Sequence, residues 1–411
     1  MGSFFVYNEA DTKNSAHAGN AIAGNIFAGQ CFWSEKHSRV TSIFTYDNEY
    51  LSARDCWSID PAMALTSGSQ PSATSLPGAF RDAAPDRWGQ TLIRHRHLRE
   101  SRERGIHLRN LNEVDYLLGV DDSSRQGSLR FALEKGGAFL HPSNDVPKLV
   151  ALPKLLDAAH RYAARQDESA ISYLLEAGSA SLGGARPKAA VQDGADLYIA
   201  KFPHRQDAWD VISWEWVALK VAAEAGIRVP ENRLINIEGQ NLLLVKRFDR
   251  DERKRIGYIS MMTLLGLTDG EQADYFDIAG KLRDVSTCAK GDLEELFRRV
   301  VLSLMLNNTD DHLRNHGLLR SGCGWRLSPV FDVNPNLDAA AIRCTGVFAE
   351  FEKESALAAM SSNADAFCLA QSEADRIISE IKAAAKACGK YARSAGIPGP
   401  ERENMLRALD L

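Results

Sequence analysis

Three residues in the second half of the chain carry side chains suited to phosphoryl-transfer chemistry. Asp310 and Asn315 lie five positions apart in the polar segment 307–317, which follows an apolar stretch ending near Leu306, and Asp332 comes 17 positions after Asn315. A carboxylate can accept the proton of an attacking hydroxyl, and carboxylate and amide oxygens are hard ligands that suit Mg²⁺ held jointly with nucleotide phosphates. A polar helix cap and an edge-strand carboxylate are the structural alternatives.

A glycine-rich loop and a lysine at the end of a strand precede these residues. The loop runs from Gly178 to Lys188, and its glycines would let backbone N–H groups approach phosphate oxygens, although it matches neither G-x-x-x-x-G-K-[ST] nor G-x-G-x-x-G. Lys201 could hold phosphates as a point charge, oriented by Glu215 on the next helix. Taken singly, these residues fit a flexible turn, a snorkelling lysine and a solvated glutamate. Together with D-x-x-x-x-N and an Asp332 expected on a strand, their order is that of a protein kinase.

The elements that must position these residues change character at Phe248. Between about residues 150 and 248 the patterns first predict helices over 152–165 and 168–177. A hairpin follows, with strands over 188–191 and 197–202 around Asp193-Gly194. Next come a helix over 210–225 that ends at Gly226 and a second hairpin of 233–237 and 241–248. After Phe248 we expect helices over 258–265, 273–282, 291–305, 350–361 and 372–388, with Gly389 ending the last. A strand-rich lobe followed by a helical lobe favours a ligand cleft between them.

The N-terminal third reads as a separate domain. Turn-forming residues from Gly136 to Asn144 mark a boundary, which predicts an N-terminal domain over 1–140, a strand-rich lobe over 150–248 and a helical lobe over 249–411. Within the first domain, many arginines lie between residues 81 and 104 on a helix expected after Pro85. We favour a solvated face over a phosphate-binding or partner-binding face for them.

The composition indicates a globular protein and argues against several other classes of protein. The 411 residues include 45% hydrophobic and 25% charged residues, which is typical of a globular protein, and 49 Lys plus Arg against 54 Asp plus Glu give a net charge of −5. There is therefore no basic surplus that signals nucleic-acid binding. The seven cysteines form no C-x-x-C pair, so we expect reduced core thiols. Without a long apolar run or a signal-like start we expect no membrane partner and a cytoplasmic location.

Four motifs give the chain a family resemblance. The segments Ser181–Lys188, Leu244–Arg250, Thr309–Asn315 and Phe331-Asp332 resemble the signatures of HipA-type serine/threonine kinases, which are the toxins of bacterial type II toxin–antitoxin modules. The segments 80–86 and 125–131 are similar, more loosely, to motifs of that family's N-terminal domain. The resemblance covers most of the chain.

The resemblance implies a fold and a set of roles. The fold class is α+β, protein-kinase-like and two-lobed, with a strand-rich N-lobe, a helical C-lobe and a small N-terminal HipA-like domain in front. The cofactors are ATP and Mg²⁺, and the reaction is phosphoryl transfer to a protein serine or threonine. By position, Asp310 is the general base, Asn315 and Asp332 are the metal ligands, and Lys201 is the catalytic phosphate-binding lysine. The implied ATP contacts are Gly183, Gly184, Ala185, Lys188, Lys201, Lys246, Phe248, His312 and Asn315.

The resemblance also implies regulation and partners. Ser181 matches the serine that family members autophosphorylate, and Ser179 is a second possible acceptor. A phosphate adds a charge of about −2 beside the nucleotide and should repel it. The implied partners are a small helix-turn-helix antitoxin (HipB-like) that binds operator DNA and a protein substrate, for which the family precedent is an aminoacyl-tRNA synthetase whose phosphorylation halts translation and favours dormancy (persistence).

Three further expectations follow from the charge and from the alternatives. With a net charge of −5, contact with operator DNA should be indirect or confined to the arginines between 81 and 104. A kinase-like phosphotransferase acting on a small molecule would keep Lys201, Asp310, Asn315 and Asp332 but would not phosphorylate Ser181. A catalytically silent partner of the antitoxin and DNA is the other alternative, and the intact acidic residues argue against it.

Overall fold

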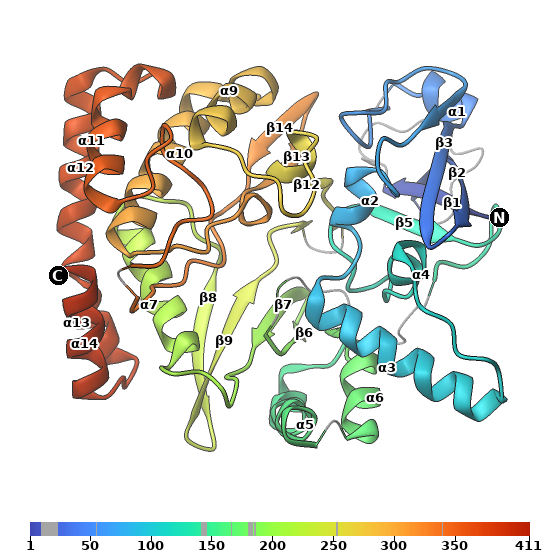
Figure 1. The fold of residues 1–411 in the computed structure, drawn as a ribbon, viewed down its shortest axis with the longest axis horizontal. Helices are drawn as coiled ribbons and strands as arrows, with labels where there is room; N and C mark the ends of the chain where they lie inside the picture. Colours follow the sequence, from blue (N-terminus) through green and yellow to red (C-terminus); the bar gives the residue numbers. More distant parts are fainter. Residues whose placement is uncertain are drawn as a thin grey trace. The chain divides into compact units, whose positions relative to one another are not determined.

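The computed structural model describes residues 1–9, 24–54, 56–140, 146–165, 167–179, 184, 186–251, 254–338 and 340–411. The chain divides into two compact units (Figure 1). The N-terminal unit comprises residues 1–205 and 249–259, and the C-terminal unit comprises residues 206–248 and 260–411. The domain boundaries expected from the sequence, 1–140, 150–248 and 249–411, stay predictions.

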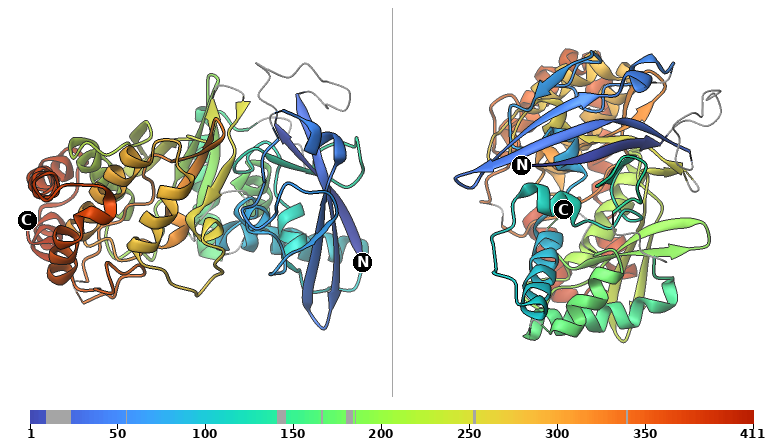
Figure 2. Two further views of the ribbon diagram at one scale, coloured as in Figure 1. Left: turned by 90° about the horizontal axis from the view of Figure 1, so that it is seen from above. Right: turned by 90° about the vertical axis from the view of Figure 1, so that its right-hand side faces the viewer.

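An antiparallel sheet forms the first part of the N-terminal unit, and its long strands lie side by side in Figure 2. Its order is β4-β3-β2-β1-β5. The strands are β1 (Gly2–Glu9), β2 (Asn25–Lys36), β3 (Arg39–Tyr46), β4 (Ser69–Pro71) and β5 (Leu129–Ala132). The β2–β3 hairpin turns through His37 and Ser38, both with positive φ, as a two-residue turn of this twist requires.

Aromatic side chains fill the space beneath this sheet. Phe4, Phe44 and Phe131 from the strands surround Phe80, with ring centroids 5.5 to 5.9 Å apart and edge-to-face geometry. Phe80 lies on the short helix α2 (Gly78–Asp82) and is fully buried. Such edge-to-face pairs stabilise a core beyond the apolar area they bury.

Helices and one hairpin complete the N-terminal unit. They are α1 (Asn48–Ser52), α3 (Arg87–Arg104), α4 (Glu113–Leu118), α5 (Leu152–Arg165), α6 (Glu168–Glu176), β6 (Lys188–Asp193) and β7 (Asp196–Lys201). The short strands β10 (Arg250–Asp251) and β11 (Lys254–Arg255) belong to the same unit, and β12 (Tyr258–Ser260) begins in it. The arginine-rich segment therefore forms α3, which ends at Gly105 with the left-handed φ of 61° that favours glycine. Both α3 and α5 pack against α6.

The C-terminal unit is built around α10 (Ala289–Met305), which α9 (Tyr275–Val285), α11 (Lys353–Ser362) and α12 (Gln371–Ala385) contact. Most of α10 is buried. The other elements are α7 (Val211–Glu224), β8 (Asn232–Ile237), β9 (Gln240–Lys246), α8 (Met261–Leu264), β13 (Gly317–Ser321), β14 (Gly324–Leu327), α13 (Cys388–Ser394) and α14 (Gly399–Leu409). Short 3₁₀ turns lie at η3 (Leu313–Asn315) and η4 (Ala364–Phe367).

Two sequence-based helix predictions were wrong. Residues 258–260 form β12, and only the short α8 follows, with the Ser260 side chain accepting a hydrogen bond from the Thr263 N–H as its N-cap. Gly389 does not end a helix but lies within α13. A Cβ at Gly389 would lie 3.2 Å from Leu406 Cδ1 on α14, so this glycine permits close helix packing instead of a cap.

The cysteines are free thiols, as expected, but most are not core residues. Only Cys31 and Cys388 are buried, whereas Cys288, Cys323, Cys344 and Cys368 are exposed. Within the described ranges, no cluster of three His, Cys, Asp or Glu side chains could hold a metal ion. No helix in those ranges combines the length and apolarity that crossing a bilayer would require.

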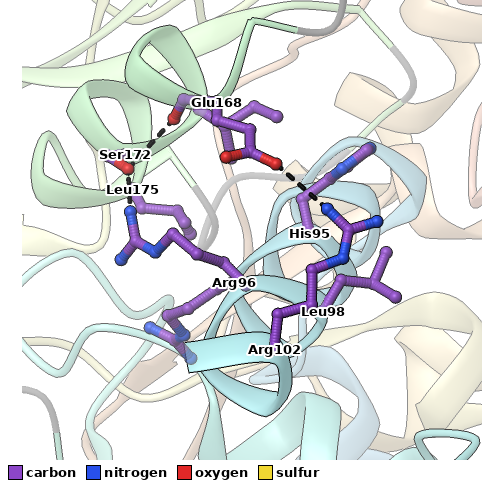
Figure 3. A pocket seen from close by; sticks show the side chains of 9 residues that line it. His95, Arg96, Leu98, Arg102, Glu168, Ser172 and Leu175 are labelled. Atoms are coloured by element: carbon purple, nitrogen blue, oxygen red, sulfur yellow. Dashed lines mark hydrogen bonds and ion pairs between the residues drawn. The ribbon is translucent and has the colours of Figure 1, made fainter. Parts of the chain in front are cut away.

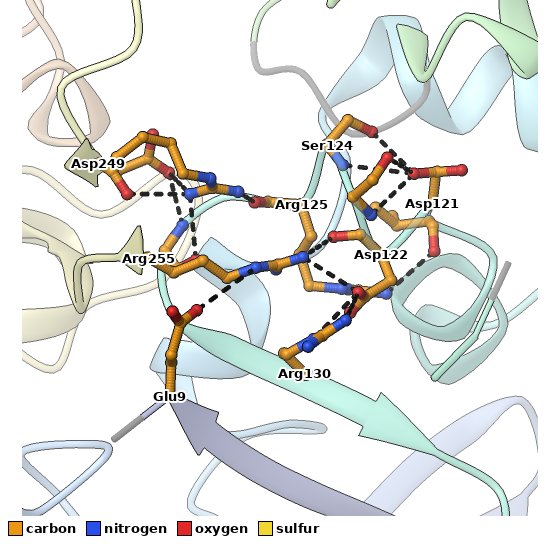
Figure 4. Close-up of polar contacts among 12 residues, drawn as sticks. Glu9, Asp121, Asp122, Ser124, Arg125, Arg130, Asp249 and Arg255 are labelled. Atoms are coloured by element: carbon orange, nitrogen blue, oxygen red, sulfur yellow. Dashed lines mark hydrogen bonds and ion pairs between the residues drawn. The ribbon is translucent and has the colours of Figure 1, made fainter. Parts of the chain in front are cut away.

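A buried ion cluster joins three segments of the N-terminal unit (Figure 4). The Asp122 carboxylate accepts from Arg130 Nε at 3.0 Å and from Arg255 Nη2 at 3.0 Å, and Glu9 lies 4.0 Å from Arg255 Nε. The neighbouring Arg125 is fully buried, which lowers its pKa to about 10. Burial alone would raise the pKa of Asp122, but Arg255 and Arg130 outweigh it and lower the pKa below its usual value.

Replacing Arg255 by methionine should destabilise the N-terminal unit by about 3 kcal/mol, because Asp122 then stays buried with one counter-charge fewer. Urea unfolding measures the free energy change. The matched control is Arg102→Met, because the Arg102–Glu168 pair is 73% and 67% exposed. We expect the control to lose at most about 1 kcal/mol. Equal losses in both variants would contradict a structural role for the cluster.

Candidate active site

The loop that carries the sequence-predicted residues begins where α10 ends. Asn307 adopts a left-handed conformation with φ 48°, and its Nδ2 donates to the carbonyls of Asn336 and Asp338, both at 3.0 Å. The Ser303 hydroxyl donates to the Asn308 carbonyl at 3.1 Å. Asparagine tolerates this backbone region better than most residues. The chain therefore leaves the helix in one fixed direction.

Asp310 presents its carboxylate at the surface of this loop while its backbone is held. The residue is exposed, and its carbonyl accepts from Asn315 Nδ2 at 3.2 Å and from the His312 N–H at 3.0 Å. Asn315 is only 7% exposed. The structure thus brings Asp310 and Asn315 together. A carboxylate fixed in this way can accept a proton from a hydroxyl group.

Cys344 contacts Asp310, which sequence reasoning missed. Its thiol donates to Asp310 Oδ1 at 3.6 Å, and its N–H donates to the Thr309 carbonyl at 2.9 Å. Partial burial and the Asp310 carboxylate raise the pKa of the Cys344 thiol, so it stays protonated and remains a donor. Nothing near residue 344 in the sequence signals this contact, because it joins segments 34 residues apart.

The neighbouring Asp311 points inward and anchors the loop. Tyr275 on α9 donates its hydroxyl to Asp311 Oδ2, and His316 Nε2 lies 3.2 Å from Asp311 Oδ1. The Thr345 hydroxyl donates to the Asp311 carbonyl at 2.6 Å. Burial and the adjacent carboxylate raise the pKa of Tyr275 well above its usual value. Burial would also raise the pKa of Asp311, but its contacts with His316 and Tyr275 outweigh this and lower it.

Asp332 lies in an irregular segment and not on a strand, which corrects the expectation from the sequence. The preceding strand, β14, ends at Leu327, and Asp332 has a left-handed φ of 58°. Its Oδ1 accepts from Asn334 Nδ2 at 3.3 Å, and the Asn334 N–H donates to Asn308 Oδ1 at 3.3 Å. This chain of bonds ties the Asp332 segment to the segment of Asp310.

The side chains present fit a divalent cation shared with phosphates. Asn315 uses its Nδ2 on Asp310, which leaves Oδ1 as the oxygen for a ligand, and Asp332 supplies a carboxylate. Asn334 Oδ1 is buried without a hydrogen-bond partner among the described residues. Mg²⁺ takes one or two protein carboxylates together with substrate phosphates and waters, so hard oxygens in this number suit it.

The N-terminal unit fixes one glycine of the Gly-rich loop. The Gly184 N–H donates to Asp86 Oδ2 at 2.6 Å, and the Gly184 carbonyl accepts from the Trp88 N–H at 3.2 Å. The Trp88 indole donates to the Lys188 carbonyl at 3.2 Å. A Cβ on Gly184 would lie 2.6 Å from Lys188 Nζ, so the ammonium lies directly beside this glycine. Asp86 is the residue before α3, but its carboxylate makes no hydrogen bond to the start of the helix. It accepts from the Gly184 N–H instead.

Lys201 and Glu215 belong to different units. Lys201 ends β7, where its backbone pairs with that of Lys188. Glu215 lies on α7 and is 3% exposed, so it is not the solvated glutamate that the sequence allowed as an alternative. A contact between Lys201 and Glu215 stays a prediction.

The predicted hinge ends close to the Asp332 segment. Lys246 ends β9, with its Nζ 3.9 Å from Glu231 Oε2. The ring of Phe248 packs on that of Phe331, the residue before Asp332, with centroids 5.4 Å apart. The structure therefore brings Phe248 of one quoted motif against Phe331 of another.

Five predicted site residues remain, and the structure describes two of them, His312 and Ser179. His312 Nδ1 is buried without a hydrogen-bond partner in the described ranges. Ser179 is fully buried, and its hydroxyl likewise has no partner there. Ser181, Gly183 and Ala185 lie outside the described residues.

Comparison with protein families identifies the chain. A model of the HipA-like C-terminal domain matches residues 180–388. The chain belongs to this family. The match covers the Gly-rich loop, the predicted hinge, the Asp310 loop and Asp332, and it confirms the predicted HipA-type resemblance.

A solved structure extends the similarity to the rest of the fold. The HipA protein in the complex of Shewanella oneidensis HipA, HipB and operator DNA matches with a TM-score of 0.60 and 14% identity, covering 94% of this chain and 93% of that one. At this identity the match shows the fold alone. It confirms the kinase-like α+β class for the HipA-like chain.

Two curated relatives are kinases by name. A putative kinase of Haemophilus influenzae is 24% identical over 134 residues, and the putative kinase Y4dM of Sinorhizobium fredii is 24% identical over 197 residues. The matches cover 29% and 43% of this chain. The chain spans only 39% and 46% of the lengths of these relatives.

Replacing Tyr275 by phenylalanine should loosen the loop, because a buried Asp311 oxygen loses its donor at a cost of about 1–3 kcal/mol. We expect a lower melting temperature and, for the kinase reaction proposed below, about tenfold slower phosphoryl transfer, equivalent to about 1.4 kcal/mol. Thermal unfolding and single-turnover assays measure both. Tyr391→Phe is the control, because its hydroxyl makes an exposed contact with Glu224. If both variants behave alike, the anchoring role of Tyr275 is wrong.

Proposed function

We propose that this HipA-like protein is an ATP-dependent serine/threonine protein kinase. The observation that carries the proposal is the Asp310 loop. An exposed carboxylate lies on a backbone held by Asn315, and the Asp332 carboxylate is tied to the same loop through Asn334 and Asn308. These are the side chains that phosphoryl transfer to a hydroxyl requires.

In this mechanism Asp310 would orient a substrate hydroxyl and accept its proton as the oxygen attacks the γ-phosphorus of ATP, while the bond from the γ-phosphorus to the bridging oxygen breaks and ADP leaves with its electron pair. Asn315 and Asp332 would hold Mg²⁺ together with the phosphates. When bound, Mg²⁺ neutralises phosphate charge and polarises the transferring group. Because Asn315 is buried and Asp310 is exposed, the cation ligand is rigid while the base stays open to a protein side chain.

Residues of the Gly-rich loop and the strand lysine would bind the phosphates. Gly184 and the adjacent Lys188 ammonium offer a backbone held in place and a positive charge, and Lys201 adds a second charge. Lys201 would be oriented by the buried Glu215. Lys246 and Phe248 would hold the adenine at the hinge, and His312 would lie beside the phosphates. Gly183 and Ala185 complete the proposed ATP contacts.

Autophosphorylation at Ser181, with Ser179 as the less favoured acceptor, would regulate the kinase. Ser179 is fully buried, so its hydroxyl reaches a nucleotide only if the loop rearranges. A phosphate of about −2 charge next to Lys188 would compete with ATP for the same positive groups.

The proposed biological role is that of a toxin in a toxin–antitoxin module. The similar Shewanella structure contains HipB and operator DNA. By analogy, the partner would be a small HipB-like helix-turn-helix antitoxin, with DNA contacted indirectly. The protein substrate would be of the aminoacyl-tRNA synthetase kind, and its phosphorylation in the cytoplasm would halt translation and favour persistence.

Labelled ATP tests the kinase activity. The full chain is incubated with [γ-³²P]ATP and Mg²⁺, alone and with a cell lysate, and compared with Asp310→Asn and Asp332→Asn. We expect labelled protein and a loss of about 100- to 10,000-fold in Asp310→Asn. The exposed Asp365→Asn is the charge-matched control and should retain full activity.

The outcomes separate the alternatives. A phosphate mapped to the peptide that holds Ser179 and Ser181 supports self-regulation. Label found only on small molecules favours the small-molecule phosphotransferase. If wild type labels nothing and Asp310→Asn behaves the same, the kinase proposal fails and a catalytically silent partner remains. If Asp310→Asn labels protein as well as wild type does, the proposed role of Asp310 as the base is wrong.

Replacing Gly184 by alanine should weaken ATP binding about tenfold, because the new Cβ displaces Lys188 Nζ and an L-residue at φ 86° costs about 1–2 kcal/mol. Isothermal titration with a non-hydrolysable ATP analogue measures the affinity. Gly194→Ala is the control, since it introduces similar strain at φ 62° with no atom within 4 Å. Equal weakening in both variants would show that strain alone, and not the Lys188 contact, sets the affinity.

A further inference from the structure

A cavity of about 250 Å³ lies between α3 and α6 of the N-terminal unit, among residues that the proposed kinase site does not use (Figure 3). Its polar lining comes from α3 and from the facing turns of α6. These residues are His95, Arg96, Arg99, Arg102, Glu168 and Ser172.

The lining has a net positive charge. Arg96, Arg99 and Arg102 recur every three residues, so that their side chains share one helix face. Three guanidinium groups against the one carboxylate of Glu168 give the lining a charge of +2. The chain as a whole has a charge of −5, so the cavity reverses its sign locally.

Two of the guanidinium groups are held in place yet keep donors for a ligand. Arg96 Nη2 donates to the Gly119 carbonyl at 2.8 Å, and Arg99 Nη1 donates to the Ser172 hydroxyl. Arg99 Nε is buried without a hydrogen-bond partner among the described residues, and its ion-pair contact with Glu103 is 3.6 Å long. A guanidinium carries five N–H donors, so most of them remain for an acceptor.

The third guanidinium can exchange its partner. Arg102 Nη1 donates to Glu168 Oε1 at 3.2 Å, and the two side chains are 73% and 67% exposed. An ion pair this exposed contributes little to stability. A doubly charged ligand can therefore take the place of Glu168 at small cost.

The pKa of His95 depends on the charge in the cavity. Burial, followed by the neighbouring Arg94, lowers the pKa of His95. Its ring packs edge-on against Tyr162 with centroids 6.0 Å apart. An anion in the cavity would favour the protonated ring and raise this pKa.

We propose that this cavity binds the phosphate group of a small molecule as a dianion, with Arg99 and Arg102 as its principal ligands. A dianion matches the charge of +2, and the planar fork of arginine suits phosphate oxygens. The volume is below the roughly 300–1,000 Å³ of sites for drug-sized ligands, which fits a small phosphate compound. A DNA duplex would need many phosphate contacts along an extended surface.

Pyrophosphate and inorganic phosphate are the probes, used with the full chain in the presence of a saturating ATP analogue that keeps the probes out of the nucleotide site. Titration calorimetry measures affinity, and proton NMR of His95 measures its pKa. We expect pyrophosphate to raise this pKa in wild type. Arg102→Gln should weaken binding at least about tenfold through loss of a charge-assisted hydrogen bond. Arg104→Gln, an exposed arginine of α3 that does not line the cavity, should bind like wild type.

Several results would overturn the proposal. These are a His95 pKa that does not move at saturating pyrophosphate, an equal affinity in Arg102→Gln and Arg104→Gln, and an equal His95 shift with acetate at the same ionic strength. Binding of duplex DNA that Arg102→Gln abolishes, without binding of pyrophosphate, would assign the surface to nucleic acid instead. Affinity for the ATP analogue, measured in the same variants, should stay unchanged, which separates this test from that of the kinase activity.

Discussion

The turn at the end of α10 is the constraint on which the candidate active site depends. Asn307 takes a left-handed conformation there and bonds through its side chain to the carbonyls of Asn336 and Asp338. The same turn therefore sets the course of two segments, the one that carries Asp310 and the one that follows Asp332. Because the backbone is fixed by these bonds, the Asp310 carboxylate can be exposed without losing its position.

Buried charge stabilises this arrangement and also the N-terminal unit. Asp311 lies under the loop with Tyr275 and His316, and Asp122 lies among arginines in the other unit. Taking a carboxylate out of water is costly, so such a cluster adds little net stability compared with an apolar core. The cluster favours one arrangement of the chain, because a buried carboxylate is stable only where its hydrogen-bond and ion-pair partners surround it. The Asp311 cluster holds the loop of Asp310, and the Asp122 cluster joins Asp122 to strands β5 and β11.

Local sequence signals predicted the elements but not the contacts between them. Asp193-Gly194 and Glu238-Gly239 marked two hairpins correctly, since turn chemistry depends on neighbouring residues. Tyr275 had only a helical pattern around it, and its contact with Asp311 spans 36 residues.

Two other residues, Asp332 and Cys344, also differ from what the sequence predicted. Asp332 was expected on a strand, whereas it lies in an irregular segment with a left-handed conformation, and its carboxylate accepts a hydrogen bond from Asn334 Nδ2. The thiol of Cys344 was expected in the core, whereas it lies at the surface beside Asp310. The partner of Cys344 lies 34 residues away in the sequence, and no local pattern of residue types encodes it.

The start of α3 shows that the site is not confined to the segment that the family model matches. That segment begins at residue 180, yet the backbone of Gly184 is held by Asp86 and Trp88. A chain beginning at residue 180 would lack both anchors, and a glycine at φ 86° has no side chain of its own to fix it. Asp86 and Trp88, which precede the matched segment, therefore hold the backbone of one glycine of the Gly-rich loop.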